Sequence, residues 1–448
     1  MRLAVIGGGG FRVPLVYGAL LEDTADLRVD EVVLHDVDSR RLGVVAEVLR
    51  QMAATAGAPP KVVAATGLDD ALRGSDFVFS AIRVGGLAGR VADERVALDL
   101  GLLGQETTGP GGVAYGLRTV PVVRHLAERV AAVAPDAWVV NFTNPAGLVT
   151  EAMSAVLGDR VIGICDSPMA MCRRVARALD VEAGRAWFDY VGLNHLGWLR
   201  AVLVDGRDQL PRLLADEQRL RTFEEGRLFD AEWLRALGAV PNEYLWYWYA
   251  HREAVRAVQE SGSATRGMFL REQQERFYET VLQDPSGALT EWQRVRRERD
   301  SSYMAESRPE GAVVGRDEAD LDGGGYQQVA LGVLAAIARN ERAVHILDVR
   351  NRGAVPGLDD EAVVEVPCLV DANGAHPVAG GTPEAHQLGL LQSVKAVERE
   401  TIAAAVEGSR ERALRAFALH PLVDSVDLAG ELLARYLDAA PELAQRFR

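Results

Sequence analysis

The sequence predicts an α/β protein in which a doubly wound parallel sheet is followed by a mixed α+β region. Three observations carry this prediction. Short apolar runs alternate with amphipathic stretches over the first 165 residues, a glycine-rich turn follows the first run directly, and longer strands begin near Trp187. Alternating strands and helices are typical of a parallel sheet wrapped by helices. At 448 residues the chain exceeds the usual size of one domain, so we expect two packed domains, residues 1–186 and residues 187–448.

Six short apolar runs predict the strands of the first domain. In chain order they are Leu3–Ile6, Glu31–His35, Lys61–Ala65, Asp76–Ala81, Ala137–Phe142 and Val161–Ile164. Such runs, separated by stretches of helix length, indicate strands that are buried on both faces. We therefore expect these six strands to form the parallel sheet.

The second domain is predicted from longer elements. They are strands at Trp187–Leu193, Trp198–Val204, Val344–Val349 and Ala362–Leu369, a helix at Tyr326–Arg339 and a helical run from His386 onward. The stretch from Asp284 to Leu321 is dense in charge and is followed by three glycines. This composition predicts either a mobile insertion or an exposed helix, to which the sequence assigns no function.

Charge and cysteine content exclude several classes of protein. The formal net charge is −15 and the basic residues are dispersed, so we expect no nucleic-acid partner. Only Cys165, Cys172 and Cys368 occur, and so sparse a set argues against a disulfide framework and for the cytoplasm. The chain begins with a strand-like run and has no apolar run of transmembrane length, so we expect neither a secreted nor a membrane protein.

The glycine-rich turn predicts a dinucleotide site. A strand that ends in Gly7, Gly8, Gly9 and Gly10 and leads into a helix lets the backbone approach a pyrophosphate at the helix N-terminus. Gly7, Gly9 and Gly10 are the expected contacts. Because Arg12 replaces the third glycine of the usual pattern, a tight turn without a ligand is the alternative.

Asp36 predicts which dinucleotide binds. It closes the second apolar strand, where an acidic side chain meets the ribose 2′-hydroxyl and repels a 2′-phosphate. The prediction is therefore NAD rather than NADP. The alternative role for Asp36 is to cap the helix that starts near Asp38.

A series of motifs farther along the chain resembles a known family. In order they are Ile82–Arg90, Asp93-Glu94, Gly104–Gly112, Asn141–Pro145, Gly163–Pro168, Gly192–His195, Pro241–Leu245 and Val364–Cys368. Together they resemble the signature of glycoside hydrolase family 4, whose NAD- and metal-dependent members differ from glycosidases that use two carboxylates. The resemblance is strongest to the 6-phospho-β-glucosidases. It implies a Rossmann-like first domain, a substrate- and metal-binding second domain that also forms the oligomer, and a fold like that of lactate and malate dehydrogenases.

Two features depart from the family pattern. The Ser or Thr that usually follows the glycine run is replaced by Phe11-Arg12-Val13, which leaves the contacts to the cofactor phosphates open. The charged stretch also interrupts the alignment between Arg276 and Tyr326.

Cys165 and His195 are the expected metal ligands. Cys165 ends a predicted strand and His195 lies in a loop between two others, so a parallel sheet could bring both to the crevice where its ligands bind. A thiolate and an imidazole with open positions suit a catalytic divalent metal. The resemblance implies that the metal is manganese (Mn²⁺) or another divalent ion. The alternatives are an inert buried thiol and a core histidine.

The resemblance also assigns the two expected catalytic residues. Tyr244 matches the family's base, which removes the proton from sugar C2, and a nearby cation or metal would have to lower its pKa. Asp166 resembles the acid that protonates the departing oxygen in α-type members, where several β-type members carry Asn. Asp166 could instead act only as a weak or outer metal ligand.

Four residues are expected to bind the substrate, also by resemblance. Arg90, Asn144 and Arg266 correspond to residues that grip the sugar and its 6-phosphate, for which the planar guanidinium is well suited. Arg266 could instead be a solvated helix charge. Glu106 is expected to organise the sugar-binding loop rather than to transfer a proton.

The function implied by the resemblance is hydrolysis of 6-phospho-β-glucosides to glucose 6-phosphate and an alcohol by oxidation, elimination, addition and reduction. The expected partner is a phosphorylated disaccharide or glycoside, and the expected assembly is a homodimer or homotetramer. Two alternatives stay open. One is a 6-phospho-α-glucosidase, because Asp166 matches the α pattern, and the other is an NAD-dependent sugar dehydrogenase.

Overall fold

The computed structural model describes residues 1–260, 265–301 and 325–447. Within them a single sheet of 13 strands runs through the molecule in the order β10-β8-β7-β12-β11-β6-β5-β4-β1-β2-β3. Off this path, β13 (Gly374–Pro377) pairs with β12, and β9 (Arg207–Asp208) pairs with β8. The six N-terminal strands are all parallel. They are β1 (Arg2–Ile6), β2 (Glu31–His35), β3 (Lys61–Ala64), β4 (Phe77–Ser80), β5 (Trp138–Asn141) and β6 (Val161–Gly163). The predicted parallel sheet is therefore confirmed.

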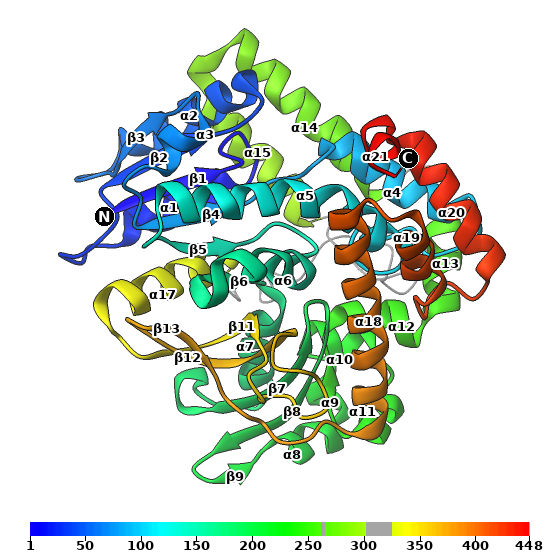
Figure 1. The fold of residues 1–448 in the computed structure, drawn as a ribbon. Coiled ribbons are helices and arrows are strands. Elements are labelled where there is room, and N and C mark those ends of the chain that lie inside the picture. Colours follow the sequence, from blue (N-terminus) through cyan, green and yellow to red (C-terminus); the bar gives the residue numbers. More distant parts are fainter. Residues whose placement is uncertain (261–264, 302–324, 448) are drawn as a thin grey trace.

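Antiparallel strands extend this sheet into the second half of the chain. In β11 (Ala343–Arg350) Asp348 pairs with Gly163 of β6, and β12 (Val363–Asp371) follows it. Beyond β12 lie β7 (Trp187–Leu193) and β8 (Leu196–Val204), seen in green in Figure 1. Because the sheet is continuous across the two halves, the domain boundary at residue 186 stays a prediction.

Helices cover both faces of the sheet. Alternate residues of β1 enter different cores: Leu3 and Val5 join one hydrophobic cluster, whereas Ala4 and Ile6 join the other. Residues of α1 (Val13–Glu22), α2 (Ser39–Ala53) and α17 (Tyr326–Arg339) join the first cluster. Residues of α5 (Pro110–Val133), α6 (Ala146–Leu157) and α18 (Ala385–Glu407) join the second. The parallel part is thus doubly wound, as predicted.

Part of the charged stretch forms a helix, α15 (Ala288–Ser301), which packs beside α2. Ala288, Trp292 and Val295 are buried along one of its faces. One face of the helix is therefore buried rather than exposed. Its apolar residues recur at helical spacing among the charged residues. Residues 302–321 of that stretch lie outside the described residues. None of the described helices is long and apolar enough to cross a membrane.

Candidate functional site

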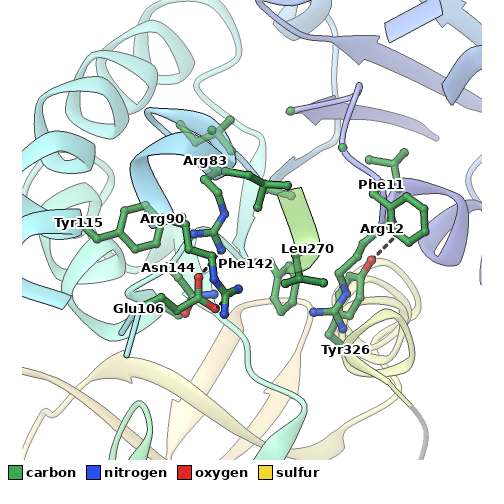
Figure 2. Close-up of a pocket in the computed structure, with 18 of the residues that line it drawn as sticks. Phe11, Arg12, Arg83, Arg90, Glu106, Tyr115, Phe142, Asn144, Leu270 and Tyr326 are labelled. Atoms are coloured by element: carbon green, nitrogen blue, oxygen red, sulfur yellow. Dashed lines mark hydrogen bonds and ion pairs between the residues drawn. The ribbon is translucent and has the colours of Figure 1, made fainter. Parts of the chain in front are cut away.

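A cavity of about 1190 Å³ lies at the carboxyl ends of the parallel strands, where this type of sheet binds its ligands. Its walls come from both halves of the chain, and Figure 2 shows part of them. Every predicted site residue lines it: Gly7, Gly9, Gly10, Asp36, Arg90, Glu106, Asn144, Cys165, Asp166, His195, Tyr244 and Arg266. The structure therefore brings the dinucleotide, metal, catalytic and substrate predictions together in one cavity.

The glycine-rich loop fits a pyrophosphate. Gly7 has a φ of +90°, and a Cβ there would lie 2.4 Å from the Ala81 carbonyl oxygen, so no other residue fits. The Gly9 N–H donates to Asp36 Oδ2 over 2.9 Å, which ties the loop to the end of β2. Asp38, rather than Asp36, caps α2 by accepting from the backbone of Arg40 and Arg41. Asp36 lines the cavity, and its two carboxylate oxygens accept backbone hydrogen bonds from Gly9 and Asp38.

Side chains from the second half of the chain hold this loop by its carbonyl groups. Tyr278 donates its hydroxyl hydrogen to the Gly9 oxygen over 2.7 Å. The Trp292 indole donates to the Phe11 oxygen over 2.8 Å, and the Tyr326 hydroxyl donates to the Arg12 oxygen over 2.6 Å. Buried carbonyl groups need such partners. The loop is therefore fixed by residues far away in the sequence.

His195 is prepared to bind a metal through Nε2. Its Nδ1 lies 2.9 Å from the Thr107 hydroxyl, and that hydroxyl donates to Gln105 Oε1 over 3.1 Å. Thr107 can therefore accept a hydrogen bond from Nδ1–H, which leaves the lone pair on Nε2. Burial lowers the pKa of His195 to about 4, so the imidazole is neutral at pH 7.

Cys165 supplies the second expected ligand. Burial, and then the charges of Glu365 and Asp166, raise the pKa of its thiol well above the ordinary value, so a thiolate here needs a cation beside it. Residues 1–260, 265–301 and 325–447 contain no group of three or more His, Cys, Asp or Glu side chains that could hold a metal ion. Two protein ligands fit a catalytic ion with open positions rather than a closed structural site.

Tyr244 lies directly against His195. The two rings stack with centroids 3.6 Å apart and planes 3° from parallel. The backbone N–H of Tyr244 donates to the side chain of buried Asn242 over 3.0 Å, at the start of the short 3₁₀ turn Glu243–Leu245. Tyr244 also lies within electrostatic range of Arg90. The expected base is thus held beside the expected metal ligand and near a cation.

Arg90 and Glu106 form a buried ionic network. Arg90 pairs with Glu94 and Glu106, each over 2.8 Å, and Arg83 pairs with Glu106 over 2.7 Å. Burial would raise the pKa of Glu106, but these two arginines lower it to about 2. Glu106 therefore stays ionised, in keeping with an organising role. Arg83 was missed as a site residue, although it lies in the Ile82–Arg90 motif.

Asp166 faces an arginine from the glycine-rich loop. Arg12 Nη2 lies 3.5 Å from Asp166 Oδ2, and the Arg12 guanidinium lies over the Tyr326 and Phe142 rings at 4.2 and 5.0 Å. Arg266, which starts α14 (Arg266–Gln283), donates through Nη2 to the Arg299 carbonyl oxygen over 3.0 Å. Arg299 is a second missed residue, because it lies in the charged stretch that the sequence left without a function.

A buried ion pair includes Arg174, one of the residues that line the cavity. Arg174 of α7 (Ser167–Ala178) donates to both carboxylate oxygens of Glu225, and the two side chains are 1% and 0% exposed. Ser167 donates its hydroxyl hydrogen to Glu243, next to Tyr244, over 2.5 Å. Burial and the nearby Glu225 raise the pKa of Glu243. Hydrogen bonds to Ser167 and Asn242 therefore hold the turn that carries Tyr244.

Both parts of the chain match models of one family. Residues 2–181 match the model described as family 4 glycosyl hydrolase, and residues 190–423 match the model of its C-terminal domain. A probable 6-phospho-beta-glucosidase of Bacillus subtilis is 30% identical and aligns over 98% of this chain and 96% of its own.

Solved structures give the same family. A 6-phospho-beta glucosidase from Thermotoga maritima, solved with manganese, NAD⁺ and glucose-6-phosphate, is 29% identical, with a TM-score of 0.81 over 99% of each chain. A 6-phospho-alpha-glucosidase from gut microorganisms, in complex with NAD and glucose-6-phosphate, is 27% identical, with a TM-score of 0.81 over 99% of this chain and 98% of its own. A malate dehydrogenase from Plasmodium falciparum, 14% identical with a TM-score of 0.51 over 91% of this chain and 98% of its own, shares the fold alone. The expected dehydrogenase-like fold is confirmed.

Proposed function

Because this chain belongs to glycosyl hydrolase family 4, we propose that it hydrolyses 6-phospho-β-glucosides to glucose 6-phosphate and an alcohol. The reaction would use bound NAD and a divalent metal, with Mn²⁺ as the first candidate. One observation carries this proposal. A single cavity joins the glycine-rich loop, the Cys165 and His195 side chains, the Tyr244 ring and several arginines. A sugar dehydrogenase would use the loop but would not need the thiol and imidazole beside a tyrosine.

The chain's own residues divide between the two bound groups. The loop Gly7–Gly10 and Asp36 would hold NAD, and Cys165 with Nε2 of His195 would hold the metal. When bound, NAD supplies a reversible hydride acceptor for the sugar and the metal supplies a Lewis acid that makes the sugar C2–H acidic. Thr107 orients His195 through Nδ1, as outer partners of metal ligands commonly do.

The remaining residues bind the sugar and move protons. Arg90, Asn144 and Arg266 bind the phosphorylated sugar, and Glu106 holds Arg90 in place as a permanent carboxylate. Tyr244 accepts the proton from sugar C2 on its phenolic oxygen. Its ring is fixed against His195, so that oxygen has a defined position beside the metal ligands.

Asp166 favours a second candidate, the 6-phospho-α-glucosidase. Its side chain lines the cavity beside the metal cysteine, where it could give a proton to a departing oxygen on the α face. Elimination through C2 restricts the anomer less than direct displacement does, so one cavity of this kind can serve either substrate class. Asp166 also pairs with Arg12. This pairing would equally suit a role for Asp166 as an outer metal ligand.

Release of p-nitrophenol from the α and β anomers of its glucoside 6-phosphate tests the function. We expect cleavage of the β anomer only when NAD and Mn²⁺ are both present under reducing conditions. The unphosphorylated β-glucoside is the control and should react far more slowly, because the arginines lose their anion. NADH that accumulates on sugar phosphates without p-nitrophenol would contradict the proposal and favour a dehydrogenase.

We propose a cytoplasmic homodimer or homotetramer whose partner is a small phosphorylated disaccharide or glycoside. The three cysteines are free thiols, which suits a reducing compartment. The net charge of −15 disfavours binding to nucleic acid. Light scattering of the purified chain would give its assembly directly.

A further inference from the structure

Helix α15 presents two arginines to the cavity. Trp292, Arg296 and Arg299 follow one another at helical spacing and share one face of the helix. The hydrogen bond from Trp292 to the Phe11 carbonyl fixes this face against the glycine-rich loop. Arg296 and Arg299 both line the cavity, one and two turns beyond that anchor. The position of Arg299 over the cavity therefore follows from packing on the loop.

Arg299 lies among other cations close to the glycine-rich loop. Desolvation, and then the charges of Arg12, Arg266 and Arg90, lower its pKa to about 9. It is also within electrostatic range of Tyr278 and Tyr326. Those two hydroxyl groups are bonded to the carbonyls of Gly9 and Arg12, and Arg299 is also within electrostatic range of Glu106, so it is near both the loop and the Arg90–Glu106 pair.

Arg12 approaches the same place from the loop itself. It follows the glycine run and precedes the first turn of α1. Its guanidinium is held over the Tyr326 ring. In Figure 2 Arg12 and Tyr326 lie together, apart from the group formed by Arg83, Arg90 and Glu106. Arg12 therefore belongs to the loop side of the cavity.

We propose that Arg12 and Arg299 form a clamp that binds the pyrophosphate of NAD, with α15 covering the cofactor. Both side chains line the cavity beside the glycine-rich loop, and two guanidinium groups suit the oxygens of a pyrophosphate. The clamp would replace the hydroxyl group of the Ser or Thr that is absent from Phe11-Arg12-Val13. This inference rests on the proposed function only for the identity of the dinucleotide.

Calorimetric titration of the full chain with NAD, ADP-ribose and glucose 6-phosphate tests the clamp without turnover. We expect Arg299→Gln to weaken the binding of NAD and of ADP-ribose by about 10- to 100-fold, the range for the loss of one charge-assisted contact. Glucose 6-phosphate should bind within about twofold of its normal affinity. Arg12→Gln should act in the same direction, so a folding defect of either variant leaves the other as a test.

Arg297→Gln is the matched control, because Arg297 lies on the same helix but is exposed and absent from the cavity wall. It should leave all three affinities unchanged. Unchanged NAD affinity in both test variants would overturn the clamp. If the test variants lose glucose 6-phosphate binding but keep NAD binding, the clamp is also overturned, and these arginines bind the sugar phosphate instead. Failure of the unmodified chain to bind NAD would instead contradict the proposed function.

Discussion

Replacing Tyr244 with phenylalanine is expected to lower kcat by about 10²- to 10⁴-fold, the usual contribution of a positioned base. The substitution removes the phenolic oxygen but keeps the ring that stacks on His195 at 3.6 Å. The cavity should therefore keep its shape, and NAD and metal affinities should stay within about threefold of normal. Steady-state rates on the chromogenic substrate, with separate titrations of NAD and Mn²⁺, measure both effects.

Tyr247→Phe is the control for this prediction. Tyr247 also lines the cavity and its ring lies 6.2 Å from that of Tyr244, but it has no assigned role in proton transfer. We expect the loss of the Tyr247 hydroxyl group to change kcat by less than about threefold. A Tyr244→Phe variant that turns over nearly as fast as the unmodified chain would show that another group removes the C2 proton.

Replacing Arg174 with methionine is expected to reduce the free energy of unfolding by about 3–5 kcal/mol. Glu225 is 0% exposed and would lose the guanidinium that binds both of its oxygens. A buried carboxylate without its partner carries most of that cost. Urea unfolding followed by far-ultraviolet circular dichroism gives the difference.

Arg177→Met is the matched control, since Arg177 lies on the same helix with its side chain exposed. We expect it to change stability by less than about 0.5 kcal/mol. The double variant Arg174→Met with Glu225→Gln should recover part of the loss, because the unpaired charge is gone. A loss below about 1 kcal/mol in Arg174→Met alone would mean that Glu225 finds another partner or water.

The strands were predictable because their boundaries are local. Glu31–His35 and Trp187–Leu193 begin and end where predicted, since each is an apolar run between polar or turn residues. The strand expected at Trp198–Val204 begins earlier, at Leu196, because it forms a tight hairpin with its neighbour at His195, whose φ is +62°. The two residues of β10 (Val240–Pro241) are too few to leave a periodic signal.

The motifs predicted residues that line the cavity, but they did not predict the contacts that support those residues. Thr107 lies in one of those motifs, yet its bond to His195 joins residues 88 positions apart. Arg299 was hidden by the charged composition of its helix, and only the packing of Trp292 on the loop brings it to the cavity. The roles of Tyr244, Asp166, Cys165 and His195 remain predictions.

Hydrolysis in D₂O, followed by proton NMR of the glucose 6-phosphate formed, tests the central claim most directly. If Tyr244 removes the C2 proton during cleavage, solvent deuterium should appear at C2 of the product, and unreacted chromogenic substrate serves as the internal comparison. Product that keeps its C2 proton, formed at a normal rate with NAD and Mn²⁺ present, would contradict elimination and indicate direct displacement at C1.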